Sequence, residues 1–333
     1  GGRGSFRVRL CGVGRFEYRG GPCTAETFLL TPGSQQALDY LGKLFLSPGD
    51  TALVGWPTYL GALGAFNAYE PNYDQLTANN NRAASSYSMT AEAAGGQVKF
   101  AYLSTDFSNP TGETLDIRGR ESLLQLTDEL GCALIEDAAY QALRYDGEPI
   151  PPILALEIAQ KGSIEDCQTI YCGSFSKTLS PGLRVGWVVA AKPVISQLVL
   201  MKQAADLHTA TLNQMAVYEV ASRIFDTHID TLRQTYGRRR DVMLAALQTH
   251  MPKGVTWTKP EGGMFIWLTL PREVDGAELL THALEAAKVA FVPGRAFFAD
   301  GSGGNSIRLS FSCSSDDEIN DGIRKLADVL RAY

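Results

Sequence analysis

GSFSKTLSPGLRVG, residues 173–186, sets a lysine and an arginine among serines and glycines between two apolar runs. Lys177 follows the run 169–172, which is typical of a buried strand, and Arg184 precedes a second run over 185–191. A lysine can act as an amine nucleophile, while serines and an arginine can bind a phosphate. The stretch therefore predicts a loop at a strand end that holds a reactive amine beside an anion site.

Three interpretations of this loop are open. Pyridoxal phosphate (PLP) needs these groups, because a protein lysine forms a Schiff base with its aldehyde while other donors hold its phosphate. A solvated lysine in a Ser/Gly-rich loop is the plainer interpretation. A phosphate-loop NTPase is the third, but its motif requires glycine before the lysine, and Ser176 stands there. The rest of the chain decides between them.

Composition narrows the class of protein. The chain has 333 residues, 45% hydrophobic and 20% charged, so it can form a large core and two domains. Its net charge of −6 gives no support for nucleic-acid binding, and no apolar run approaches membrane-spanning length. The six cysteines form no Cys-x-x-Cys pair and the four histidines show no metal-ligand spacing. We expect a cytoplasmic protein without a secretory signal that binds no nucleic acid, membrane or metal.

Strands alternate with helices from Pro22 onward, which predicts an α/β fold with a mostly parallel sheet. The stretch Gly33–Gln35 opens a helix directly after an apolar strand, where free amides favour an anion. Asn109 follows a strand at 98–103, and Asp137 ends the run that begins at Cys132. Because ligands gather at the carboxyl ends of parallel strands, we expect Asn109, Asp137 and Lys177 at one edge of the sheet.

The end of the chain has a different pattern. Residues 193–249 are periodically helical and include Arg238–Arg240, which we expect to form a solvated helix face. The alternating run 307–312 places Arg308 opposite an apolar strand face, and 315–318 is a capping box for a last helix. We therefore predict an atypical or disordered start over 1–21, a large domain over 22–224 and a smaller α+β domain over 225–333.

Five motifs, taken in order, resemble those of one family. They are Gly33-Ser34-Gln35-Gln36, Pro57-Thr58-Tyr59, Asn109-Pro110-Thr111-Gly112, Asp137-Ala138-Ala139-Tyr140 and Ser174-Phe175-Ser176-Lys177 with Arg184. Over residues 22–333 the chain is similar to fold-type I PLP-dependent aminotransferases of class I/II. It looks closest to the branch of 2-aminoadipate and kynurenine aminotransferases, which includes the enzyme-like domain of MocR-type regulators. The resemblance implies PLP as cofactor and a mostly parallel mixed sheet flanked by helices.

The resemblance also implies a role for each matched residue. Lys177 would form the Schiff base and move a proton, Asp137 would face the pyridine nitrogen, and Tyr59 would stack on the ring. Tyr140 and Asn109 would hydrogen-bond the phenolic oxygen, and Arg308, with Asn109, would bind the substrate carboxylate. The phosphate would be held by Gly33, Ser34, Gln35, Ser174, Ser176 and Arg184. Without the resemblance, a helix cap, a turn, core packing and a surface arginine are the plainer interpretations of these residues.

The implied reaction moves an amino group between an L-amino acid and a 2-oxo acid such as 2-oxoglutarate, in a homodimer. Aromatic, branched or 2-aminoadipate-like donors are expected, and loops around 262–265 and 297–298 are candidates for selecting them. A PLP lyase or racemase, a MocR-like effector-binding module and a PLP-binding remnant without turnover are the alternatives. The remnant is an alternative because residues 1–20 do not match the longer segment that normally precedes the phosphate loop, so we expect a truncated or altered start.

Overall fold

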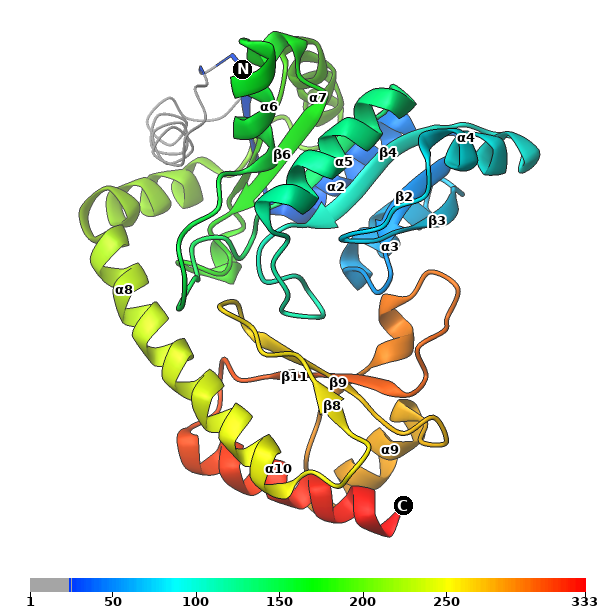
Figure 1. Cartoon of the computed structure of the whole chain (residues 1–333). Helices are drawn as coiled ribbons and strands as arrows, with labels where there is room; N and C mark the ends of the chain where they lie inside the picture. Colours follow the sequence, from blue (N-terminus) through cyan, green and yellow to red (C-terminus); the bar gives the residue numbers. More distant parts are fainter. Residues whose placement is uncertain (1–23, 25) are drawn as a thin grey trace.

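A large mixed β-sheet forms the upper half of the molecule (Figure 1). The structure is a computed structural model that describes Thr24 and residues 26–333. In the described chain this sheet has seven strands in the order β1-β7-β6-β5-β4-β2-β3. The strands are β1 (Phe28–Thr31), β2 (Thr51–Gly55), β3 (Asn72–Leu76), β4 (Val98–Ser104), β5 (Ala133–Asp137), β6 (Thr169–Ser174) and β7 (Gly186–Val189). Strands β2 to β6 are mutually parallel and β7 is antiparallel to both neighbours, so the predicted mostly parallel sheet is confirmed.

Helices cover both faces of this sheet, so its strands are apolar on both sides. In β2, Ala52 and Val54 pack in the cluster beneath the helices α2 (Ser34–Phe45) and α3 (Leu60–Asn67), while Leu53 packs in the cluster of α4 (Ala84–Ala93) and α5 (Ile117–Leu130). The alternation follows from the period of two residues along a strand. The flanking helices are α2 (Ser34–Phe45), α3 (Leu60–Asn67), α4 (Ala84–Ala93), α5 (Ile117–Leu130), α6 (Ile153–Lys161) and α7 (Lys192–Ala205), with short turns η1 (Ile164–Asp166) and η2 (Pro181–Leu183).

A second, antiparallel sheet lies below the first in Figure 1. Its order is β10-β11-β9-β8, from β8 (Thr256–Trp257), β9 (Phe265–Thr269), β10 (Val292–Pro293) and β11 (Ser306–Ser310). It is accompanied by α9 (Gly276–His282), the π-helical turn η3 (Ala283–Ala287), η4 (Gly294–Phe297) and α10 (Asp316–Ala332). The predicted capping box is confirmed, because the Ser315 and Glu318 side chains bond each other's backbone N–H.

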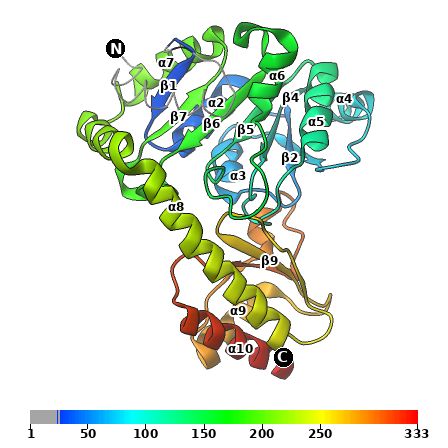
Figure 2. The ribbon, with the colours of Figure 1, turned by 60° about the vertical axis from the view of Figure 1, so that its left-hand side comes forward.

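Helix α8 (Thr211–His250) runs from one sheet to the other (Figure 2). Val217 and Phe225 join the core of the large sheet, while Met243 and Leu247 join that of the small sheet. The predicted boundary after residue 224 falls inside this continuous helix, and the division into domains stays a prediction. The predicted solvated arginine face was wrong for Arg240, which is buried, donates to the Pro260 carbonyl at 2.9 Å and pairs with Asp146.

The described residues bear on the expectations about membrane spans, metal sites and cysteines. None of the helices in the described chain combines the length and apolar character of a bilayer-crossing segment. No group of three or more metal-ligating side chains comes together within the same residues. The described cysteines are free thiols, buried at Cys132, Cys167 and Cys172 and exposed at Cys313. The predicted atypical start, 1–21, lies outside the described residues.

Candidate active site

Neighbouring strands of the large sheet end at one edge, and the predicted site residues follow them. Asp137 is the last residue of β5, and Ser174 is the last residue of the parallel strand β6, three residues before Lys177. Strand β1 runs in the same direction as β6, because both are antiparallel to β7, and Thr31 and Ser174 pair with the same residue, Gly186. The start of α2 therefore lies at the same edge.

Asp137 is a buried carboxyl group with two donors. The Tyr102 hydroxyl donates to Oδ2 at 2.9 Å, and the Ala139 N–H donates to Oδ1 at 3.3 Å. Burial raises the pKa of Asp137, against the opposing effects of these two bonds and of Lys177. A buried carboxylate of this kind is stabilised by a positively charged group beside it, so Asp137 can pair with a cationic part of a ligand at this sheet edge.

The Lys177 amine is half-buried and lies 5.8 Å from the centre of the Tyr140 ring. Burial lowers its pKa, and the positive charges of Arg308 and Arg184 lower it further, while Asp137 acts in the opposite direction. A lysine whose pKa is lowered loses its proton more readily and becomes a better nucleophile.

The start of α2 forms an anion cradle with Arg184. No side chain of the described residues caps this helix, so its first N–H groups stay free at the positive end of the helix dipole. Gly33 has φ 80° and ψ 168°, and a Cβ there would lie 2.8 Å from Arg184 Cζ. Position 186 also requires glycine, because a Cβ there would lie 2.8 Å from the Ser34 nitrogen.

Two serines complete the cradle. Arg184 donates to the Pro32 carbonyl at 3.2 Å and to Ser176 Oγ at 3.4 Å, and the Ser176 N–H donates to Ser174 Oγ at 3.0 Å. The side-chain nitrogen of Gln35 donates to the Gly61 carbonyl at 2.6 Å. An exposed guanidinium, free helix amides and two hydroxyl groups are the donor set that a phosphate monoester needs, so these residues fit the phosphate of PLP.

Arg308 reaches the same region from the small sheet. Its Nη1 donates to Asn109 Oδ1 at 2.6 Å, and its guanidinium lies 4.1 Å from the centre of the Phe265 ring and 5.0 Å from that of Phe297. Its Nε is buried without a hydrogen-bond partner among the described residues. Burial lowers the pKa of Arg308, against the opposing effects of Tyr140 and Tyr59. A guanidinium between two rings, with a donor unsatisfied, can bind a carboxylate.

Two tyrosines lie among these charges. Tyr140 is buried with its ring 5.7 Å from that of Phe265, and burial and Asp137 raise its pKa. Tyr59 immediately precedes α3, and burial and Asp137 raise its pKa while Arg308 and Arg184 lower it. The structure therefore brings the aromatic, acidic and basic predicted residues into one region.

Sequence patterns missed some residues of this region. Tyr102 was not distinguished from the other apolar residues of β4, and only its bond to Asp137 marks it. Gly186 comes two residues after Arg184, in an apolar run, and no turn signal marks a position where only glycine fits. Both depend on contacts between strands that no local pattern records.

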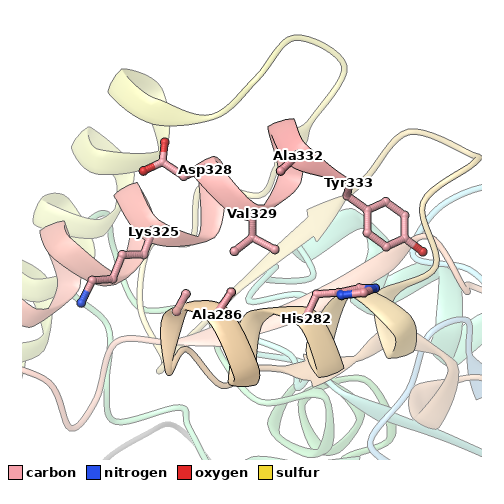
Figure 3. A pocket seen from close by; sticks show the side chains of 8 residues that line it. His282, Ala286, Lys325, Asp328, Val329, Ala332 and Tyr333 are labelled. Atoms are coloured by element: carbon pink, nitrogen blue, oxygen red, sulfur yellow. The ribbon is translucent and has the colours of Figure 1, made fainter.

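A separate surface groove of about 590 Å³ lies between η3 and α10 (Figure 3). It is lined by His282, Ala286, Ala287, Lys325, Asp328, Val329, Ala332 and Tyr333, none of which belongs to the predicted site. Its charged residues are paired within α10: Lys325 with Asp321 at 2.6 Å and Asp328 with Arg331 at 2.8 Å. We therefore assign no role to this groove.

Comparison with known proteins identifies the family. The sequence profile of the family described as "Aminotransferase class I and II" matches residues 16–326. The chain belongs to this family. The match begins at residue 16, whereas the predicted resemblance begins at residue 22. The family assignment and the structural relatives make PLP the cofactor of this aminotransferase, as the five motifs predicted.

The relatives agree with the predicted branch. The chain is 41% identical to aromatic-amino-acid aminotransferase 1 of Thermococcus litoralis, over 93% of this chain and 74% of the relative. It is also 41% identical to 2-aminoadipate transaminase of Thermus thermophilus, over 92% and 76% of the two chains. The crystal structure of Pyrococcus horikoshii kynurenine aminotransferase, described as a complex with PMP, superimposes with a TM-score of 0.91 at 38% identity, over 100% of this chain and 82% of that one. HTH-type transcriptional regulators also match, at 27 to 30% identity.

Proposed function

We propose that this aminotransferase moves an amino group from an aromatic, branched or 2-aminoadipate-like L-amino acid to a 2-oxo acid such as 2-oxoglutarate. The observation that carries the proposal is the meeting of Lys177, Asp137 and the α2 anion cradle at one sheet edge, opposite Arg308. The names of the relatives support the choice of donors.

The residues would divide the work by their chemistry. When bound, PLP supplies a ring that takes up the negative charge left on the substrate Cα. Lys177 would hold the cofactor through its amine and, as a free amine, would move a proton at the substrate Cα, which its lowered pKa favours. Asp137 would keep a ring nitrogen protonated, because a buried carboxylate favours a positively charged partner. Tyr59 would cover the ring, and Tyr140 with Asn109 would donate to its phenolic oxygen.

The two ends of the ligands would be held by arginines of different sheets. The Gly33–Gln35 amides, Ser174, Ser176 and Arg184 hold the phosphate, since they form the anion cradle. Arg308 binds the α-carboxylate of the amino acid with its remaining donors, and Asn109 fixes the direction of the guanidinium. Such charge-assisted pairs contribute about 1.5–3 kcal/mol per hydrogen bond.

We also propose a cytoplasmic homodimer. Leu207, just before α8, and Leu212 and Met215, in its first turns, are 69%, 79% and 59% exposed, which is costly for large apolar side chains in water. A second copy of the chain would cover them. The buried free thiols of Cys132, Cys167 and Cys172 agree with a reducing compartment.

Single-turnover spectroscopy tests the reaction. When the PLP-loaded protein is mixed with L-phenylalanine without an oxo acid, the absorbance of the lysine-bound cofactor should give way to that of the aminated cofactor. Lys177→Ala should lose this change and also lose the cofactor adduct that borohydride fixes, whereas Lys253→Ala, at an exposed lysine, should retain both. A spectrum that stays constant with aromatic, branched and acidic amino acids would show an effector-binding module or a remnant instead.

A further inference from the structure

Two buried arginines share one carboxylate beside the candidate active site. Asp106 Oδ1 lies 2.9 Å from Arg120 Nη2 and 3.5 Å from Arg144 Nη2, and all three side chains are at most 8% exposed. Arg120 is held on its other side by the carbonyls of Leu115 and Pro151, each at 3.0 Å. Arg120 therefore fixes the position of the Asp106 carboxylate, to which Arg144 binds.

Arg144 also bonds to the small-sheet side of the molecule. Its Nη1 donates to Glu261 Oε2 at 2.8 Å. The backbone around it is joined to the same segment, because the Tyr145 N–H donates to the Glu261 carbonyl at 2.8 Å and the Gly263 N–H donates to the Leu143 carbonyl at 2.9 Å. One guanidinium thus connects the segment after β4, the segment after β5 and the segment before β9.

Phe107 fills the space between these segments. It is fully buried, has φ 51°, and its ring centre lies 4.8 Å from Arg144 Cζ. A Cβ on either Gly262 or Gly263 would come within 2.5 Å of it. A left-handed backbone at a bulky residue is strained and persists only where its surroundings enforce it. Phe107 therefore packs closely against both the Arg144 guanidinium and the backbone at Gly262 and Gly263.

We propose that Arg144 is a positioning residue for the substrate carboxylate, acting through the three segments that it connects. Asp106 precedes Asn109 by three residues, Arg144 follows Tyr140 by four, and Glu261 precedes Phe265 by four. Asn109 and Phe265 both contact the Arg308 guanidinium. Arg144 itself touches neither Lys177 nor Asp137 in the described contacts, so it sets the carboxylate site without taking part in the chemistry. The inference rests on the proposed role of Arg308.

The test compares substrate binding with cofactor binding in Arg144→Met. The KM for L-phenylalanine and the inhibition constant of hydrocinnamate, which has the carboxylate but no amine, should both rise about tenfold to a hundredfold, because a displacement of about 1 Å can cost on the order of 10²-fold. The dissociation constant of PLP should rise much less than the KM, since the anion cradle and Asp137 belong to the large sheet and only the contacts of Tyr140 and Asn109 with the cofactor lie in the connected segments. A residue needed only for stability would change the PLP constant and kcat together with KM.

Arg144→Lys and Glu261→Gln provide milder versions if the methionine variant folds poorly. Lysine cannot bond Asp106 and Glu261 in the same forked geometry, and glutamine removes the charge that Arg144 pairs with at position 261. Both variants should therefore raise the KM less than Arg144→Met does. Arg233→Met is the matched control: Arg233 also donates into this loop, to the Ala142 carbonyl at 2.9 Å, and its described contacts do not include Asp106 or Glu261. Its KM should not change.

Two outcomes overturn the inference. One is an unchanged KM and hydrocinnamate constant in Arg144→Lys and Glu261→Gln. The other is a rise in Arg233→Met equal to that in Arg144→Met. If the wild-type protein itself shows no reaction with any amino acid, the proposed function fails instead, and the two failures are thereby distinguished.

Discussion

Gly33→Ala tests whether the start of α2 holds the cofactor phosphate. At φ 80° and ψ 168° the backbone occupies a region that is essentially restricted to glycine, and an alanine there costs about 1–3 kcal/mol. The new Cβ would also lie 2.8 Å from Arg184 Cζ, which is too close for two carbon atoms. The guanidinium therefore has to leave the Pro32 carbonyl and Ser176, and with them the anion cradle.

The loss can be expressed as cofactor affinity. A hydrogen bond to a charged group contributes about 1.5–3 kcal/mol, so displacing Arg184 should weaken PLP binding by about tenfold to a hundredfold. The assay titrates the cofactor-free protein with PLP and follows the quenching of its tryptophan fluorescence. Thermal unfolding of the cofactor-free protein, measured in parallel, gives the strain separately from the binding.

Gly162→Ala is the matched control. Gly162 also has a positive φ, 83°, but it lies after α6 and an added Cβ would have no described atom within 4 Å. This variant should lose stability and keep its affinity for PLP. If Gly33→Ala binds PLP as tightly as the wild type does, the phosphate is bound elsewhere and the assignment of the cradle to Gly33 and Arg184 is wrong.

Other substitutions test the remaining features. Burial lowers the pKa of Lys177 in the folded protein, so its positive charge destabilises the fold below that folded-state pKa. This cost disappears as the pH rises through the pKa of lysine in the unfolded chain, about 10.4. Cofactor-free Lys177→Met should therefore resist urea better than the wild type at neutral pH, with a gain that shrinks toward pH 10. Arg120→Met removes the closer of the two cations that pair with the buried Asp106 carboxylate and should lower the free energy of unfolding by about 3–5 kcal/mol in urea titrations. Arg118→Met, exposed on the same helix, should change it by less than about 0.5 kcal/mol. Leu212→Glu should shift the sedimenting species from dimer to monomer. Met89→Glu is the control, because Met89 is an exposed apolar residue of α4, and it should leave the dimer intact. If the Leu212→Glu dimer is as stable as that of the wild type, the interface lies elsewhere.

Local sequence patterns were sufficient to predict the large sheet, but they could not predict the contacts between the two sheets. Alternating strands and helices predict parallel strands, and polar residues after strand ends predict a shared edge, because both depend on neighbours in the sequence. Helix α8 shows the limit: its periodicity predicts a helix, but it cannot show that Phe225 and Met243 enter two different cores. The predicted boundary at 224 consequently fell within a continuous helix. Arg240 was misjudged for the same reason, since an arginine run is typical of a solvated face and its buried acceptor, the Pro260 carbonyl, is specified by the fold.

The carboxylate site shows why the rest of the candidate site needs the structure. The bond from Arg308 to Asn109 joins residues 199 apart, and that from Arg144 to Glu261 joins residues 117 apart. In the sequence, Arg308 lies on an alternating strand and Arg144 beside a turn, where surface arginines are common. Burial changes their meaning, because a guanidinium withdrawn from water requires partners, and those partners lie in segments that also carry Asn109, Tyr140 and Phe265. A substrate carboxylate bound to Arg308 would therefore depend on the contact between the two sheets, whereas the phosphate would depend on the large sheet alone. Mutations at the contact should separate substrate affinity from cofactor affinity, which a site built on one sheet would not allow.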